Sequence, residues 1–223
     1  MLLLAIHISD GILDPAWWVG GFVFLALGLA VAMRKLDERA IPRIGVLTAA
    51  FFVSSQQHWD AGGVSVHLLL NGLVGIVLRR RAPIAIAVGL AMQYFLFHHG
   101  GLATLGINFC VLAFPAWLAG WCFRCGRGRS RPGFGTGLVL GLACASLTVL
   151  LHVSVLYFGG KGDWTALALL SLVAHLPVIV LEGIGVGFAV KVLAKGKPEW
   201  LGLEPERLDQ PSGGKISSNG TAH

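Results

Sequence analysis

The sequence predicts an all-α, polytopic membrane protein, a bundle of about seven transmembrane helices, and its composition carries this prediction. The chain is 55% hydrophobic and 13% charged, with a mean hydropathy of +0.75, whereas about a quarter of the residues of a soluble domain are charged. It also contains 31 glycines, and small residues let membrane helices approach each other closely. The net charge is +6. Binding of nucleic acid would need a basic face on a soluble domain, and the sequence has none, so a nucleic-acid partner is excluded.

Apolar runs divide the chain into the expected spans. A helix needs roughly 20 mainly apolar residues to cross the bilayer, and fewer where its neighbours shield it. Asp14 suits the N-cap of the first span, and Pro15 suits its first helical position. The second and third spans are short, so we expect them to be tilted or shielded by the bundle. The expected spans cover about residues 15–33, 44–57, 64–78, 83–97, 103–123, 134–158 and 165–193.

Basic residues follow every second span, which predicts the orientation of the bundle. The positive-inside rule assigns these boundaries to the cytoplasm. The N-terminus is then outside, the C-terminus is inside, and the protein is a multi-pass component of the cell inner (cytoplasmic) membrane. The residues concerned are Arg34, Lys35, Arg39, Arg43, Arg79, Arg80, Arg81, Arg124, Arg127, Arg129, Arg131, Lys191, Lys195 and Lys197.

We expect one bundle, residues 1–198, followed by a polar tail, residues 199–223. The tail is rich in Gly and Ser and is predicted to be disordered. Residues 1–6, MLLLAI, lack a basic region and form too short an apolar run for a signal peptide. We therefore expect them to belong to the mature chain.

Histidines gather at the face opposite the basic residues. Neutral imidazole is the commonest metal ligand in proteins and suits nickel, cobalt, copper and zinc. A single histidine in an apolar helix is more readily explained as a hydrogen-bonded packing residue, but the clustering favours a site for a divalent transition metal. Of the 8 histidines, the five near this face are His7, His58, His67, His98 and His99.

The sequence lacks the usual motifs of hydrolytic enzymes and of ATPases. HExxH, GxSxG and the P-loop pattern do not occur, so we expect no enzymatic activity and no ATP hydrolysis by this chain. Cys122 and Cys125 form a lone CxxC, whereas a structural zinc site needs four ligands. Small packing side chains are the preferred interpretation of this pair.

Two polar residues of the last span share one helix face, because Glu182 follows His175 by seven positions. We interpret Glu182 as the acceptor of a buried structural hydrogen bond that fixes this span. Two functional classes other than a metal-capturing subunit stay open. One is a stand-alone secondary transporter or channel for a divalent metal, and the other is a membrane enzyme or haem protein that uses His152 and His175.

Four motifs occur in order along the bundle. They are HISDGIL at residues 7–13, GGVSVHLL at 62–69, FHHGGLATLGIN at 97–108, and His175-Leu176-Pro177 through Glu182-Gly183. They resemble M-H-I-x-D-G-x-L, G-G-T-S-x-H-L-L, F-G-D-G-G-L-x-A-L-G-A-N and H-x-P-L-x-x-x-E-G of the CbiM/NikM family. This family provides the substrate-binding (S) component of cobalt and nickel energy-coupling-factor (ECF) transporters, which belong to the ABC transporters. The resemblance extends from about residue 7 to residue 201.

The resemblance implies a subunit of an ATP-driven importer that captures a cobalt or nickel ion at the extracytoplasmic face. In the family the ligands are the N-terminal amine, the next backbone amide nitrogen, the imidazole of the second residue and a later histidine. By motif, the two imidazoles are those of His7 and His67, and the N-terminal part of the bundle is the metal-binding segment. Four nitrogens in a near-planar arrangement suit nickel or cobalt. No organic cofactor is implied.

The resemblance also implies partners that supply the energy. These are a transmembrane coupling (T) subunit and ATPase subunits, with a small accessory membrane subunit as a further candidate. A loop closes over the metal, and the complex reorients when the ATPase module engages. Small-xxx-small contacts of family S components engage the coupling subunit, which assigns Ala26 and Ala30 to that contact.

One departure from the family concerns the start of the chain. The family histidine directly follows the initiator methionine, whereas His7 follows six residues, and an amine six residues upstream cannot form the same chelate ring. Residues 1–6 could be trimmed, the chain could start elsewhere, or the site could recruit other side chains. His58, His98 and His99 are the candidates for recruitment, and a site of three or four imidazoles would favour zinc or cobalt over square-planar nickel.

Overall fold

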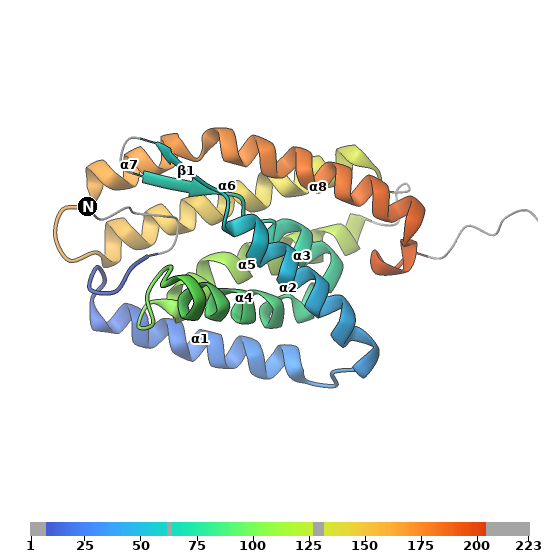
Figure 1. Ribbon diagram of the computed structural model, residues 1–223, viewed down its shortest axis with the longest axis horizontal. Coiled ribbons are helices and arrows are strands. Elements are labelled where there is room, and N and C mark those ends of the chain that lie inside the picture. Colours follow the sequence, from blue (N-terminus) through green and yellow to red (C-terminus); the bar gives the residue numbers. More distant parts are fainter. Residues whose placement is uncertain (1–7, 62–63, 127–131, 204–223) are drawn as a thin grey trace, which may run out of the picture.

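Helices make up most of the described chain in the computed structural model of the protein (Figure 1). The structure describes residues 8–61, 64–126 and 132–203, without the side chains of residues 58–61 and 64–65. The predicted all-α membrane bundle is confirmed. The α-helices and strands are α1 (Pro15–Met33), α2 (Ile41–Ser55), β1 (His58–Ala61), β2 (Val64–His67), α3 (Asn71–Leu78), α4 (Ala82–Phe97), α5 (Leu105–Gly126), α6 (Phe134–Gly159), α7 (Thr165–Ala174) and α8 (Leu176–Gly196), with short 3-10 helices η1 (Glu38–Ala40), η2 (Arg79–Arg81) and η3 (Pro198–Trp200).

Four of these helices, α1, α5, α6 and α8, are long and apolar enough to cross a membrane. They differ in how far the rest of the protein covers them. The most apolar stretch of α5 is 61% buried, whereas that of α1 is only 11% buried. Helix α5 contacts α1, α3, α4 and α6, so it forms the centre of the bundle, and α1 lies at its edge (Figure 1).

The third expected span, residues 64–78, is not one helix. Its first part is strand β2, which pairs antiparallel with β1 in a register that runs from His58 opposite His67 to Ala61 opposite Val64. Alternating β-branched residues, Val64 and Val66, favour the strand. Helix α3 therefore has only 8 residues, about 12 Å of helix, and all but one of them are buried. The bundle shields this short span, as expected.

Leu69 and Leu70, directly before α3, lie within the bundle, so their N–H groups need partners there. The Glu182 carboxyl of α8 supplies them. The Leu70 N–H donates to its Oε1 and Oε2 at 2.9 and 3.0 Å, and the Leu69 N–H donates to Oε1. The interpretation of Glu182 as a structural hydrogen-bond acceptor is confirmed.

The backbones of α3 and α5 touch where they cross. A Cβ atom on Gly75 would overlap the carbonyl oxygen of Ala116, and one on Gly120 would overlap the carbonyl oxygen of Gly75. Only glycine permits this separation of the two helices. The high glycine content that predicted a membrane bundle thus has a direct packing role at its centre.

The last expected span, residues 165–193, is divided into α7 and α8. The division falls at His175, two residues before Pro177. Proline has no N–H to donate and disfavours a helical conformation in the residue before it. Prediction from apolar length alone missed this interruption.

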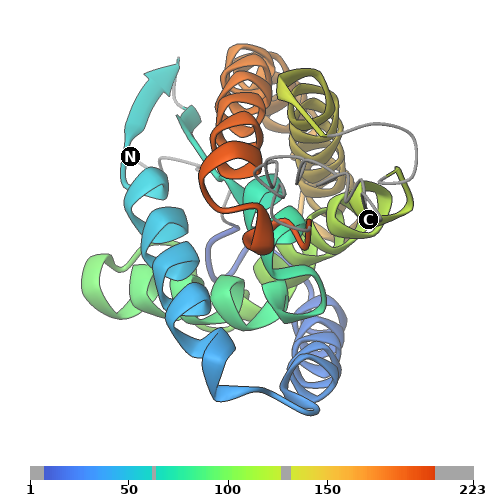
Figure 2. The ribbon, with the colours of Figure 1, turned by 90° about the vertical axis from the view of Figure 1, so that its right-hand side faces the viewer.

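Segments that carry basic residues meet at one end of the bundle. The Arg80 and Arg81 guanidinium groups each donate to the Lys35 carbonyl oxygen at 3.4 Å, and the Arg79 guanidinium donates to that of Leu201 at 2.6 Å. The end of α1, η2 and η3 therefore lie together, at the right of Figure 1 and towards the viewer in Figure 2. Basic residues were predicted to follow every second span and so to lie at one end of the bundle, and these contacts agree with that prediction. The cytoplasmic orientation of this end stays a prediction.

Residues 199–203 of the predicted tail pack against the same end. Leu201 is fully buried, and the Arg43 guanidinium lies 5.4 Å from the centre of the Trp200 ring. Residues 204–223 of the predicted tail lie outside the described residues.

The opposite end collects the N-terminal segment, the β1–β2 hairpin and α7 (Figure 1). Leu13 forms an antiparallel bridge with Gly160, and the Lys161 N–H donates to the Ile12 carbonyl oxygen at 2.7 Å. The segment that precedes α1 therefore runs along the end of α6. Residues 12 and 13 are thus held by residues 160 and 161, which lie far away in the sequence.

Candidate metal site

A polar clamp holds residue 8, directly after His7. The Ile8 N–H donates to Oδ1 of Asn108 at 2.9 Å, and Nδ2 of Asn108 donates to the Ile8 carbonyl oxygen, also at 2.9 Å. The Thr104 hydroxyl donates to the same carbonyl at 2.5 Å. Both backbone groups of Ile8 are thus fixed, and its side chain is fully buried. His7 itself lies outside the described residues.

Asp10 extends this clamp to the loop before α5. Its carboxylate accepts the N–H groups of Leu102 and Thr104, each at 3.0 Å. The loop approaches so closely that a Cβ atom on Gly101 would overlap the Asp10 carboxylate. Two of the four sequence motifs, residues 7–13 and 97–108, are therefore parts of one structural unit.

His67 is the last residue of β2, and its side chain is fully buried. Its Nδ1 lies 3.2 Å from the Leu68 carbonyl oxygen. A carbonyl oxygen can only accept, so this contact places the proton on Nδ1 and leaves a lone pair on Nε2. Glu182 holds the N–H groups of Leu69 and Leu70 immediately afterwards, which fixes the backbone that carries His67.

His98 and His99 occupy different environments although they are adjacent. His99 is half-buried, and its ring centre lies 6.0 Å from that of His67, with the two rings edge to face. His98 is exposed, has a left-handed backbone with φ of 53°, and lies against Tyr94 at 6.3 Å between ring centres. Of the two, His99 is thus the one beside His67.

A small cavity links His99 to the clamp. It measures about 10 Å³ and is lined by His99, Asn108 and the Gly100–Gly101 backbone, among others. This is about the space that one water-sized particle needs. The cavity connects the histidine pair to the side chain that holds Ile8.

The remaining predicted ligand, His58, stands opposite His67 in the β1–β2 register, and its side chain is outside the described part. No three His, Cys, Asp or Glu residues within the described ranges are grouped closely enough to hold a metal ion. A ligand set of three or more such side chains here therefore needs a side chain outside the described part, such as that of His7 or His58.

Ala26 and Ala30, the predicted partner-contact residues, lie on α1 at the edge of the bundle. Both side chains are exposed. Helix α1 packs mainly on α5 and α4. Their exposed positions are compatible with a helix contact.

Asn108, Thr104 and Asp10 were not among the predicted site residues. All three stand inside motifs of the sequence, residues 7–13 and 97–108. The available signal was the presence of polar side chains at fixed positions in otherwise apolar stretches. Their partners, 92 to 100 residues away in the chain, could not be identified from one sequence.

Replacing Asn108 by Leu is expected to weaken binding of nickel and cobalt by about 10- to 100-fold, the usual effect of removing a group that orients a metal ligand. The variant removes both contacts with Ile8, so the segment containing His7 is no longer held. Isothermal titration of the purified protein measures the change. Thr148→Val serves as the control, because it removes a buried hydroxyl from α6 outside the clamp. Equal affinities of the two variants would show that the clamp does not order the site.

The family model described as "Cobalt uptake substrate-specific transmembrane region" matches residues 7–200 of the chain. A protein of Haemophilus influenzae that is assigned a metal-transport role by inference is 35% identical over 200 residues, which are 86% of this chain and 95% of that one. The cobalt transport protein CbiM of Geobacter sulfurreducens is 30% identical over 215 residues, which are 88% of this chain and 62% of that protein.

A solved structure shares the fold. The crystal structure of a transition metal transporter superposes with a TM-score of 0.73 at 21% identity, over 85% of this chain and 92% of that one. An identity this low is evidence for the fold alone. The family match covers nearly the whole described bundle, including the clamp and His67. The chain therefore belongs to the CbiM family of cobalt uptake, substrate-specific transmembrane components.

Proposed function

We propose that this protein is the metal-capturing subunit of an ATP-driven ECF importer for cobalt or nickel in the cytoplasmic membrane. It binds the ion at the extracytoplasmic end and does no catalysis itself. One observation carries the proposal. The buried ring of His67 lies beside His99, and a small cavity joins His99 to Asn108, which clamps the residue after His7. Three histidine-bearing segments thus converge.

His67 and His7 are the proposed principal ligands. The Ile8 N–H is already donated to Asn108, so a backbone amide ligand has to come from His7 or from before it. His99 is the best placed of the other candidates for a further imidazole. His58 stands opposite His67 in the β1–β2 register, but its side chain is outside the described part. His98 lies against Tyr94 instead. Nitrogen ligands of this kind suit cobalt and nickel.

The proposed partners are a transmembrane coupling subunit and ATPase subunits, with Ala26 and Ala30 at the contact with the coupling subunit. Relatives support an assembly of several parts. One in Methanocorpusculum labreanum is named as a fused cobalt transport protein CbiMQ, with 26% identity. One in Archaeoglobus fulgidus is named as a fused nickel transport protein NikMN, with 27% identity. Alanines at i and i+4 let a partner helix approach closely.

The test is uptake of radioactive nickel and cobalt by cells that lack their own importers. We expect accumulation when the protein is produced together with the coupling and ATPase subunits, and its loss when the ATPase is inactivated. Accumulation that persists without the ATPase would contradict the proposal and favour a stand-alone secondary transporter or channel. Failure of the purified protein to bind either ion would contradict metal capture itself.

A further inference from the structure

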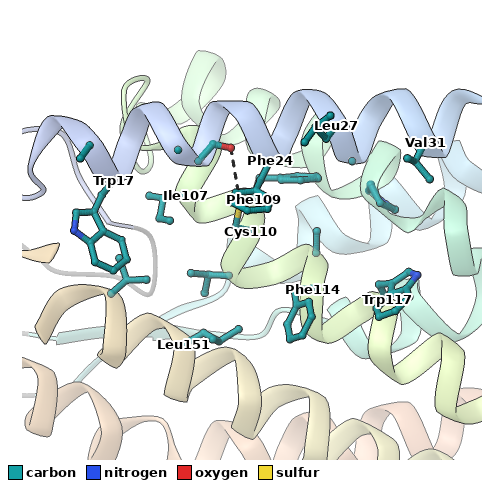
Figure 3. Close-up of a pocket in the computed structure, with 18 of the residues that line it drawn as sticks. Trp17, Phe24, Leu27, Val31, Ile107, Phe109, Cys110, Phe114, Trp117 and Leu151 are labelled. Atoms are coloured by element: carbon teal, nitrogen blue, oxygen red, sulfur yellow. Dashed lines mark hydrogen bonds between the residues drawn. The ribbon is translucent and has the colours of Figure 1, made fainter. Parts of the chain in front are cut away.

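A long apolar groove runs between α1, α5 and α6, and none of the described histidines lines it. It has a volume of about 820 Å³. Figure 3 shows Trp17 at one end and Val31 and Trp117 at the other, with Phe114 directed into the space between the helices. From Trp17 to Val31 the groove follows 14 residues of helix, about 21 Å. One leaflet contributes about half of a hydrocarbon core of roughly 30 Å, so the groove can take a full acyl chain.

A single charged residue lines this groove among the described residues, and it stands at the basic end. This residue is Arg80 of η2, whose side chain is exposed. Its guanidinium has five N–H donors, and one of them makes a contact of 3.4 Å with the Lys35 carbonyl oxygen. No ion pair joins Arg80 to an acidic side chain in the described part of the chain. The groove thus combines an apolar length with a cation at one mouth.

The groove uses a different face of α1 from the proposed coupling-subunit contact. Each residue turns an α-helix by about 100°, so Ala26 points about 200° away from Phe24, which lines the groove. Neither Ala26 nor Ala30 is among the lining residues. Ala26 thus faces nearly the opposite side of α1, whereas Ala30 lies about 60° from Leu27, at the border of the groove.

A lipid is the occupant that the apolar length of the groove and the single basic residue at its mouth favour. Basic pockets between transmembrane helices bind anionic lipid head groups, and arginine matches the geometry of a phosphate well.

We propose that this groove binds one anionic phospholipid of the surrounding membrane. An acyl chain lies along α1 and α5, and the phosphate lies at the Arg80 guanidinium. The bound lipid fills the gap between α1 and α6 and so supports a helix that is otherwise covered on few sides. The proposal does not rest on metal capture, because its readout is lipid retention.

The test is native mass spectrometry of the purified full-length protein with phosphatidylglycerol or with zwitterionic phosphatidylcholine. Gly20→Leu fills the groove, since Gly20 lines it and a Cβ atom there meets nothing within 4 Å. Gly45→Leu is the matched control on α2, because Gly45 is exposed, equally open and outside the groove. Arg80→Ala removes the cation, and Arg39→Ala removes an exposed arginine that does not line the groove.

We expect the unaltered protein to retain one phosphatidylglycerol in preference to phosphatidylcholine by about fivefold, the effect of one basic residue near an anionic lipid surface. Arg80→Ala loses this preference and Arg39→Ala keeps it. Gly20→Leu loses retention of both lipids and Gly45→Leu keeps it. Equal retention of the two lipids by the unaltered protein, or equal retention by the two glycine variants, would overturn the proposal. So would a photo-crosslink from position 20 to the coupling subunit instead of to lipid.

Discussion

Replacing His67 by Ala is expected to abolish stoichiometric binding of nickel and cobalt, a loss of affinity of more than about 100-fold, since removal of even an outer group costs 10- to 100-fold. His67 is a proposed principal ligand with a fully buried imidazole, and its Nδ1 contact with the Leu68 carbonyl oxygen leaves the Nε2 lone pair for the proposed metal. Isothermal titration of both ions into purified protein measures the effect. Retained tight binding would remove His67 from the ligand set.

Matched histidine variants sharpen this test. His98→Ala is the control, because His98 is exposed and lies against Tyr94, and we expect it to bind metal as the unaltered protein does. His99→Ala is expected to weaken binding if the His99 ring, 6.0 Å from that of His67, joins the site. His67→Asn keeps a donor for the Leu68 carbonyl and therefore separates loss of the ligand from loss of packing. The unfolding temperature of each variant reports the packing contribution.

Replacing Glu182 by Ala is expected to lower the free energy of unfolding by about 2–6 kcal/mol. The variant leaves the N–H groups of Leu69 and Leu70 without their acceptor, and each buried unsatisfied group costs roughly 1–3 kcal/mol. Glu182 is 1% exposed, so water cannot easily substitute for the carboxyl group. Unfolding in mixed micelles, followed by tryptophan fluorescence, measures the change.

Glu182→Gln is the informative partner variant, because its amide oxygen can still accept both N–H groups. We expect it to keep most of the stability that Glu182→Ala loses. Equal losses in the two variants would show that the hydrogen bonds to α3 are not what Glu182 contributes. Glu182→Ala should also reduce metal affinity, since residues 69 and 70 directly follow His67.

Apolar length predicted the long helices well but not the interruptions between them. Residues 15–33 were predicted and found as α1, because a continuous apolar run of this length has few alternatives in a bilayer. Residues 64–78 are equally apolar, yet they divide into β2 and α3. The segment that joins them is held by the Glu182 carboxyl, 112 residues away from Leu70 along the chain. Hydropathy carries no information about such a contact.

The candidate site was predictable by residue type and motif but not in its geometry. The pattern singled out His67, and its role as a ligand stays a prediction, although the structure shows its ring buried beside that of His99. His98 and His99 point to different environments because His98, at the end of α4, has a left-handed backbone conformation. Two adjacent histidines in a sequence do not reveal such a conformation. The role of Asn108 likewise depends on the return of residue 8 to the start of α5.

The contact of Glu182 with the residues before α3 has a consequence for the synthesis of the protein. Leu70 leaves the ribosome 112 residues before the side chain that accepts its N–H. Until α8 has been made and inserted, this N–H needs water or another temporary partner, because hydrocarbon offers none. A nascent chain that ends before residue 182 therefore lacks the acceptor that holds the segment after His67.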